Sequence, residues 1–257
     1  MTPKTTVTHS EWTAPPEQLS LLMGELHIWR ILFSRLRDSV DEAYETLSED
    51  ERQRAGRFRF EKDRVQSMLS RAALRSLLGR YLSAKPRDIV FNYGPSNKPG
   101  LEHPIPSDVT PFSFNVSHSG DIALIAIAAL PNVGIDVEII RPDFATAEVA
   151  KRFFSPGEVR KLQSLAKREQ AEAFFNCWTR KEAYIKAVGV GLSIPLDSFD
   201  VEFGPGKQAR LLEIRGGLER ASAWWMSSLD AGDGYAAAVV ARGKPATLAG
   251  YDYEAIS

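Results

Sequence analysis

Two parts of this chain carry the same local signals in the same order. Ser48 opens a Ser-Glu-Asp-Glu sequence and Ser155 opens a Ser-Pro-Gly-Glu sequence, and both have the pattern of a capping box that starts a helix. In the second, proline occupies the first helical position, which suits a helix start. The two capping boxes lie 107 residues apart. A repeat of this length predicts two related folding units.

Helices and strands are predicted after both capping boxes in the same order. Apolar residues at helical spacing predict long amphipathic helices over residues 63–82 and 169–188. Each helix is followed by a strand ending in Gly-Pro and later by a buried strand opening with aspartate, and these strands are offset by 110 and 112 residues. The slow drift is typical of two α+β units with small insertions. The units join near residues 131–133, and ligands often bind at such an interface.

A strand with two carboxylates is predicted directly after this join. In residues 133–140, apolar side chains alternate with Asp136 and Glu138, so the two acids share one face of the strand. Residues two apart on a strand lie about 7 Å from each other, which lets both ligate one cation directly or through water. The alternative is a half-buried strand whose acidic face meets solvent.

The second long helix adds a third acid and a lysine. At 100° per residue, Glu182 and Lys186 fall at about 40° and 80° from Trp178, at the border of the apolar arc. The alternative is an ordinary glutamate–lysine pair, which stabilises an exposed helix by about 0.2–0.5 kcal/mol. Three acids around one point suit Mg²⁺, and a lysine beside that ion suits transfer of a phosphate-containing group.

The composition is that of an ordinary globular protein. The chain has 257 residues, 44% hydrophobic and 25% charged, with a net charge of −1 that gives no general attraction to nucleic acid. No segment has the apolar length of a membrane span, and residues 1–16 lack the core of a signal peptide. The only cysteine, Cys177, lies on an apolar helix face, so we expect a buried thiol. A reducing, cytoplasmic setting and a frayed N-terminus are expected.

Two further segments are candidates for contacts with an anion. Arginines crowd residues 52–80, where they face phosphate, an acidic partner or solvent. Residues 114–120 predict a polar turn, in which Ser117, His118 and Ser119 either hold an anion with nearby N–H groups or satisfy one another. No second histidine stands at ligand spacing from His118, so zinc is not expected. Residues 97–100 predict a loop.

Five motifs in order resemble the surfactin-type (Sfp-like) 4′-phosphopantetheinyl transferases, over roughly residues 47–198. The motifs are Asn97-Lys-Pro99, Phe114-Asn-Val-Ser-His-Ser119, Gly134-Ile-Asp-Val-Glu138, Arg152-Phe-Phe-Ser155 and Trp178-Thr-Arg-Lys-Glu-Ala-Tyr-Ile-Lys186. The resemblance implies an α/β fold of the α+β type, with two similar subdomains related by a pseudo-two-fold axis, each an antiparallel sheet packed with a long helix. They would span residues 1–131 and 132–257, and the second would carry the metal site.

The resemblance also implies a reaction. Enzymes of this family transfer the 4′-phosphopantetheine arm of coenzyme A to a serine hydroxyl of an apo acyl or peptidyl carrier protein, and they release 3′,5′-ADP. Mg²⁺ would bridge the pyrophosphate and neutralise charge as the bond breaks. Coenzyme A and an apo carrier protein are therefore the expected partners, with no nucleic acid and no membrane. An internally duplicated chain that supplies both walls of its site is expected to be a monomer.

Matching the family's motifs implies a role for each candidate residue. Asp136, Glu138 and Glu182 match the Mg²⁺ ligands, and Glu182 also matches the proposed base. Lys186 matches the lysine that binds the pyrophosphate and stabilises the departing oxygen. The remaining matches are to coenzyme A: Ser117 and His118 at its phosphates, with His118 also counted as catalytic, Lys98 and Pro99 beside adenine, and Arg54 and Ser67 near the 3′-phosphate. One departure is Glu51, where a better-known member has a second lysine for that phosphate.

Two other classes remain open at the level of the sequence. A Mg²⁺-dependent nuclease or phosphodiesterase also uses clustered Asp, Glu and Lys, and it fits the arginine-rich half. The chain lacks a broad basic face, however, and Lys186 lies 48 residues beyond Glu138 rather than on the same strand. The other class is a non-catalytic binding module with charged helix faces. It predicts that coenzyme A with Mg²⁺ does not raise the melting temperature.

Overall fold

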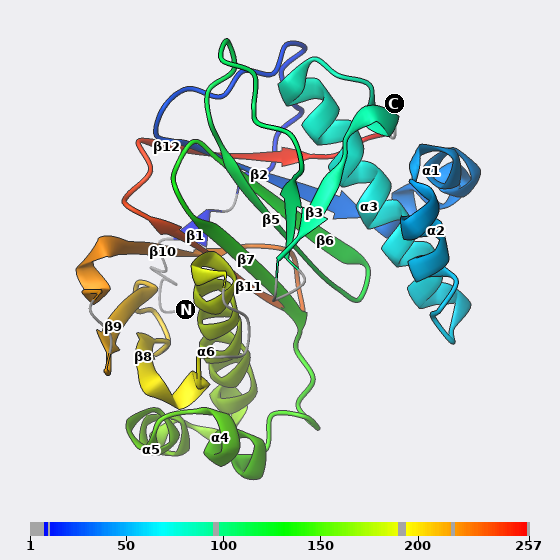
Figure 1. Cartoon of the computed structure of the whole chain (residues 1–257). Coiled ribbons are helices and arrows are strands. Elements are labelled where there is room, and N and C mark those ends of the chain that lie inside the picture. The colour runs from blue at the N-terminus through cyan, green and yellow to red at the C-terminus, as the bar shows by residue number, and fades with distance from the viewer. Residues whose placement is uncertain (1–7, 10, 95–97, 190–193, 217–218, 256–257) are drawn as a thin grey trace.

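The protein, described here from a computed structural model, is built from four layers in the order helix, sheet, sheet, helix (Figure 1). Two four-stranded sheets lie face to face, and one long helix covers the outer face of each. The structure describes residues 8–9, 11–94, 98–189, 194–216 and 219–255.

The first sheet has the order β12-β2-β6-β5, in which β2, β6 and β5 are antiparallel neighbours. Its strands are Thr247–Asp252 (β12), Glu25–Leu32 (β2), Ile122–Ala128 (β6) and Ser113–Ser119 (β5). Helix α3, Glu61–Leu82, packs against its outer face, where Trp29 and Ile31 meet the buried leucines and alanines of the helix.

The second sheet has the order β1-β10-β11-β7, in which β10, β11 and β7 are antiparallel neighbours. Its strands are Thr8–His9 (β1), Trp224–Leu229 (β10), Tyr235–Arg242 (β11) and Val133–Ile139 (β7). Helix α6, Lys167–Val188, packs mainly on β7 and β11 and buries Phe174, Phe175 and Ala183. The two halves therefore share one plan, as the sequence repeat predicted.

The inner faces of the two sheets form a third apolar core between them. Val133, Ile135 and Val137 point into this core from β7. Because side chains alternate along a strand, Asp136 and Glu138 lie on the other face, toward α6. Strand β6 is buried along its whole length because both of its faces are covered, which explains its continuous apolar sequence.

Shorter elements surround this frame. The short helices are Val40–Thr46 (α1), Glu49–Ala55 (α2), Ala147–Phe153 (α4) and Pro156–Ser164 (α5). Two small hairpins pair Phe91–Tyr93 (β3) with Pro99–Leu101 (β4), and Phe199–Glu202 (β8) with Arg210–Ile214 (β9). Single 3₁₀ turns span Phe33–Arg35, Arg37–Ser39, Pro86–Asp88, Leu196–Ser198 and Ala221–Ala223.

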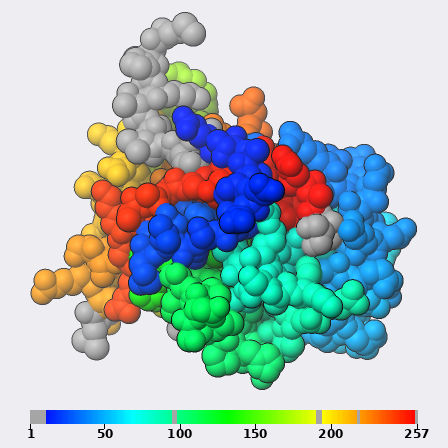
Figure 2. Space-filling model, turned by 90° about the horizontal axis from the view of Figure 1, so that it is seen from above, coloured from blue at the N-terminus to red at the C-terminus, as the bar shows by residue number. Residues whose placement is uncertain are grey.

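Each sheet receives one strand from the opposite end of the chain. The C-terminal strand β12 pairs in parallel with β2, and the N-terminal strand β1 pairs in parallel with β10. A bridge between Thr13 and Tyr251 brings the two terminal segments together, and Figure 2 shows them side by side on one face of the molecule. The division of the chain into two subdomains between residues 131 and 132 stays a prediction. Strands β1 and β12 each pair with a strand from the other side of this division.

The predicted elements agree with the structure at most positions. Both long helices begin two residues earlier than predicted and end where predicted, and both capping boxes are formed. The polar turn predicted over residues 114–120 is wrong, because most of it belongs to strand β5. The predicted loop at residues 97–100 is wrong in its second half, where Pro99 begins strand β4; Asn97 lies outside the described residues.

Candidate active site

The two halves of the protein are joined along β5 and β7 by side chains rather than by a backbone ladder. Alternate polar side chains of β5 accept hydrogen bonds from alternate backbone N–H groups of β7. These pairs are Asn115 Oδ1 with Ile135 N at 2.9 Å, Ser117 Oγ with Val137 N at 3.4 Å, and Ser119 Oγ with Ile139 N at 3.1 Å. The polar alternation of the motif therefore builds the seam, while the backbone of β5 pairs with β6.

A glycine sets the distance between α6 and β7. A Cβ atom on Gly134 would lie 2.1 Å from the carbonyl oxygen of Ala183 and 2.3 Å from the amide nitrogen of Ala187. Real Cβ atoms do not approach other atoms this closely, so the helix packs against the strand backbone only because residue 134 has no side chain. This contact brings Glu182 and Lys186 over the acidic face of β7.

Asp136 is the centre of a buried polar cluster at this seam. Its Oδ1 lies 2.6 Å from the ammonium of Lys186 and accepts a hydrogen bond from Ser117 Oγ at 2.8 Å. Lys186 also donates to Ser117 Oγ at 2.9 Å, and Ser119 donates to Glu138 Oε2 at 2.8 Å. The second oxygen of Asp136, Oδ2, is buried and has no hydrogen-bond partner in the structure.

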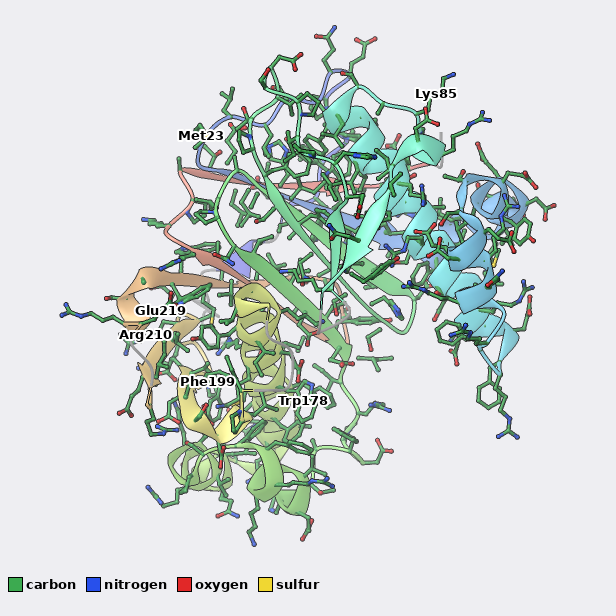
Figure 3. All side chains as sticks on the ribbon, viewed as in Figure 1. Met23, Lys85, Trp178, Phe199, Arg210 and Glu219 are labelled. Atoms are coloured by element: carbon green, nitrogen blue, oxygen red, sulfur yellow. The ribbon has the colours of Figure 1, made fainter. Side chains whose placement is uncertain are left out.

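These side chains line one open cavity of about 350 Å³. Its lining residues are Val116, Ser117, His118, Asp136, Glu138, Trp178, Glu182 and Lys186. Strands β5 and β7 and helix α6 thus all contribute to it. Figure 3 shows Trp178 beside α6, on the side away from Phe199, which packs against Tyr184 of the same helix.

The carboxylates in the cavity disturb one another's protonation. The pKa of Glu182 lies above its usual value, first because burial removes the carboxyl group from water and then because the Asp136 carboxylate is close. The pKa of Glu138 is raised for the same two reasons, in the same order. Lys186 acts in the opposite direction on both groups. The cavity therefore holds more negative charge than its single ammonium compensates, and a bound cation would relieve this.

The side chains of the cavity fit a hard divalent cation in kind, although they are not closed around a point. Across the parts of the chain that the structure describes, no group of three or more His, Cys, Asp or Glu side chains is close enough to hold a metal ion. The three acids nevertheless offer only oxygen ligands, which is the donor set that Mg²⁺ prefers. Asp136 Oδ2 is a buried acceptor with no partner, which a cation would satisfy.

The residues predicted to contact coenzyme A fall into two groups. Ser117 and His118 line the cavity, but Arg54, Ser67, Lys98 and Pro99 do not. Arg54 stacks on the ring of Tyr93 at 3.9 Å and lies 3.6 Å from Asp50. Lys98 uses its ammonium on backbone carbonyl groups of Val133 and Lys186. Ser67, on α3, is half-buried, and Pro99 begins β4. Their predicted contacts with the coenzyme stay predictions.

Glu51 has a structural partner that explains its departure from the family pattern. Its carboxylate is buried, lies 2.7 Å from Arg75 Nε and 3.5 Å from Arg71 Nε, and accepts from the backbone N–H of Ser48 at 3.0 Å. Arg71 keeps one buried nitrogen, Nη1, without a hydrogen-bond partner, and its guanidinium lies 5.8 Å from the ring of Tyr93, on which Arg54 also packs. A second cation, paired with Glu51 but with its Nη1 unpartnered, therefore stands near Arg54, on α3 rather than on α2.

Two contributors to the site were missed from the sequence, and a third, Ser119, was predicted only as part of an anion-holding turn. Val116 and Trp178 line the cavity, and Ser119 holds Glu138. Trp178 belongs to the apolar arc of α6, so its pattern predicted only burial. Asn115, Ser117 and Ser119 alternate with other residues, which is the pattern of a strand. This pattern was the signal that could have placed Ser119 on the same face as Ser117.

Comparison with known proteins places the chain in a family of transferases. The profile of the 4′-phosphopantetheinyl transferase superfamily matches residues 132–240, and that of the N-terminal part of 4′-phosphopantetheinyl transferase matches residues 34–130. The chain is 36% identical over 232 residues to the 4′-phosphopantetheinyl transferase HetI of Nostoc sp., covering 90% of this chain and 94% of the relative. The chain therefore belongs to the 4′-phosphopantetheinyl transferase family and is an enzyme of that class.

One further relative and one solved structure are also similar to this chain. The 4′-phosphopantetheinyl transferase Sfp of Bacillus subtilis is 36% identical over 155 residues, which is 60% of this chain and 66% of that protein. Among solved structures, the Thermotoga maritima holo-[acyl-carrier-protein] synthase is 24% identical with a TM-score of 0.34, over 44% of this chain and 63% of the other. No helix in the described residues is long and apolar enough to cross a membrane.

Proposed function

We propose that this enzyme transfers the 4′-phosphopantetheine arm of coenzyme A to a serine hydroxyl of an apo carrier protein, in a Mg²⁺-dependent reaction that releases 3′,5′-ADP. The observation that supports this most directly is the buried, unpartnered Oδ2 of Asp136, in a cavity shared with Glu138, Glu182 and Lys186. Coenzyme A is named as the bound ligand of a similar structure, the acyl-carrier-protein synthase of "Chronobacterium ammoniagenes".

Asp136, Glu138 and Glu182 would hold the metal ion. Mg²⁺, when bound, neutralises charge on the pyrophosphate and on the oxygen that leaves. The pKa values of Glu138 and Glu182 are raised first by burial and then by the nearby Asp136 carboxylate, and a bound cation would offset both effects. The nuclease alternative has no observation of its own in its favour now that the family is known.

The reaction needs positioning and a route for one proton. The serine oxygen of the carrier forms a bond to the phosphorus that bears the pantetheine arm, and the bond from this phosphorus to the bridging oxygen breaks. Glu182 takes the serine proton, directly or through water, and its raised pKa brings it closer to working pH. Lys186 stabilises the departing oxygen with its ammonium. Because the carrier supplies the nucleophile, the enzyme does not need an activated serine of its own.

The remaining contacts belong to coenzyme A. Ser117 and His118, at the wall of the cavity, would bind its phosphates. Lys98 and Pro99 would lie beside adenine, and Arg54 and Ser67 near the 3′-phosphate. Arg71 supplies a second cation near Arg54, which replaces the lysine that Glu51 displaces in this chain. The rate effect of such groups comes from fixed geometry and charge rather than from covalent chemistry.

Mass spectrometry of an apo carrier protein tests the proposal. Incubation with coenzyme A, Mg²⁺ and the enzyme should add the mass of one phosphopantetheine arm to the carrier, and EDTA should abolish the addition. Asp136→Asn and Glu182→Gln should lower transfer by at least about 10²-fold while the variants keep their fold. Unmodified carrier with the wild-type enzyme, across a panel of fatty-acid, polyketide and peptide carriers, would refute the reaction. Transfer at the wild-type rate by either variant would refute the site.

A further inference from the structure

The side chain of Lys98 bridges the two halves of the protein. Lys98 directly precedes β4 in the N-terminal half, yet its Nζ donates to two backbone oxygens of the C-terminal half. The Lys186 carbonyl oxygen lies at 2.7 Å and the Val133 carbonyl oxygen at 3.1 Å. One of these belongs to the last turn of α6 and the other to the first residue of β7. The ammonium therefore ties the end of the helix to the start of the strand.

The carbonyl groups that Lys98 meets are among those that a helix leaves unsatisfied. The last four C=O groups of an α-helix have no partner within the helix, and they form the negative end of its dipole. In α6, Gly189 N binds the Ile185 oxygen, Lys98 binds the Lys186 oxygen, and Asn132 Nδ2 binds the Ala187 oxygen at 3.2 Å. Among the described residues, two of these oxygens therefore accept from side chains outside the helix, and of these two side chains only Lys98 carries a charge.

The contact is also enclosed. Burial lowers the pKa of Lys98 to about 8, and the nearby ammonium of Lys186 adds to this effect. No carboxylate lies within ion-pair distance of Lys98 among the described residues. Lys98 is half-buried, and its hydrogen bonds within the described part of the chain go to backbone oxygens. These contacts hold its ammonium in one position instead of leaving it in solvent.

We infer that Lys98 is a positioning residue for the transferase reaction, which fixes α6 against β7 from the other half of the protein. The residue whose carbonyl group it holds, Lys186, is the one whose ammonium lies 2.6 Å from Asp136. A shift of the backbone at residue 186 therefore moves the ammonium relative to the carboxylates. This inference rests on the proposed function, and it goes beyond the contact between the residue 97–100 segment and adenine. A lysine has three donors, so one remains for a ligand.

Steady-state kinetics separates positioning from ligand binding. Lys98→Met keeps the aliphatic stem and removes all donors; Lys98→Gln keeps a shorter donor. We expect Lys98→Met to lower kcat by about 10- to 100-fold, because misplacement of about 1 Å has this effect on a reacting geometry. Because the third donor of Lys98 is left for adenine, the KM for coenzyme A should rise as well, but by a smaller factor than kcat falls. Lys85→Met is the matched control, an exposed lysine of the same half, labelled near the end of α3 in Figure 3. It should leave both constants unchanged.

Hydrogen–deuterium exchange gives a readout that does not depend on activity. In Lys98→Met, amides in the last turn of α6 should exchange faster, whereas Lys85→Met should exchange like the wild type. Where Lys98→Met does not fold at the assay temperature, the same comparison with Lys98→Gln decides. A raised KM with unchanged kcat and exchange would show a ligand contact and overturn the inference, as would wild-type values throughout. Failure of the wild-type enzyme to modify any carrier would instead overturn the proposed function.

Discussion

Replacing Gly134 by alanine tests how closely the helix and strand of the site must approach. The new Cβ would lie 2.1 Å from the Ala183 oxygen and 2.3 Å from the Ala187 nitrogen, both of which are backbone atoms of α6. Backbone atoms cannot rotate away as the end of a flexible side chain does. The helix must therefore move off the strand by about 1 Å before the contact reaches the shortest distances seen in real packing.

The size of the effect follows from that displacement. Forcing a methyl group into a fully packed site costs about 1–3 kcal/mol. For a protein of this length, that corresponds to a fall in melting temperature of about 2–4 °C for each kcal/mol. Catalysis should suffer more, because Glu182 and Lys186 move with the helix while Asp136 and Glu138 stay on the strand. A misplacement of about 1 Å lowers a rate by on the order of 10²-fold.

Two measurements on the same variant check this reasoning. Calorimetry gives the melting temperature, and transfer to an apo carrier protein gives kcat. Gly157→Ala is the matched control, because its Cβ would meet only Ser155 Oγ, at an ordinary distance of 3.7 Å. The control should melt and react like the wild type. Gly134→Ala with wild-type melting temperature and wild-type kcat would show that the close approach is not required, and the account of how the site is positioned would fail.

Three further predictions concern buried polar groups. Glu51→Gln should lower the free energy of unfolding by about 3–5 kcal/mol, because Arg75 keeps a buried charge without its carboxylate; urea unfolding measures this. Asn115→Ala should lower it by about 1–3 kcal/mol, because the buried N–H of Ile135 loses its acceptor. Burial lowers the pKa of His27 below its ordinary 6.5, so protonation favours the unfolded chain. Stability should therefore fall as pH drops below about 6.5, with a smaller fall in His27→Gln measured by urea midpoints at pH 7 and pH 5.

Each of these predictions has a result that contradicts it. Unfolding of Glu51→Gln within about 0.5 kcal/mol of the wild type would mean that Arg75 is satisfied by its two carbonyl partners, Pro86 and Ile89. For Asn115→Ala, substitution of the exposed Asn92 by alanine is the control. Equally small changes in the free energy of unfolding for both variants would show that the contacts between β5 side chains and β7 do not contribute to stability. If the stability of the wild type and of His27→Gln depends on pH in the same way, His27 does not cause the loss of stability at low pH.

The sequence predicted the parts of this fold that local patterns specify. The capping boxes at Ser48 and Ser155 place helix starts through hydrogen bonds within four residues, and both are formed. The alternation around Asp136 specified which face the acids take, because a strand repeats every two residues. Cys177 is buried, as its helical position predicted, and burial raises the pKa of its thiol.

Other parts depend on contacts between distant residues and were not predictable in this way. The polar alternation from Asn115 to Ser119 reads as a turn until β7 is available to donate its N–H groups. The buried Lys181 reads as a charged helix residue, yet it lies 2.8 Å from Glu158 and donates to two backbone oxygens from another part of the chain. The terminal strands β1 and β12 join sheets in the opposite half, and no local pattern reports such an exchange.

Comparison of the two halves shows why, in the described part of the chain, only the second has a polar site between its long helix and its sheet. Helices α3 and α6 both have 22 residues, and the positions 106 residues before Glu182 and Lys186 are Ser76 and Arg80. On the strand beneath α3, β2 presents His27 and Trp29 instead of carboxylates. There the T-shaped contact of His27 with Tyr251 and the tilted contact of Trp29 with Tyr251, at 5.3 and 5.0 Å between ring centroids, fill the space with aromatic rings.

Since Tyr251 lies on β12, which pairs with β2 in the same sheet, its ring packs beside His27 and Trp29 on the outer face beneath α3. Among the described strands, β7 is an edge strand of its sheet, and its acids face a helix that Gly134 brings close and a cavity of about 350 Å³. The two halves thus use one arrangement of helix on sheet for opposite purposes. In the first half, aromatic packing closes the position and contributes stability. In the second half, carboxylates and a lysine keep it polar and open, which is the condition that a phosphate-transfer site requires.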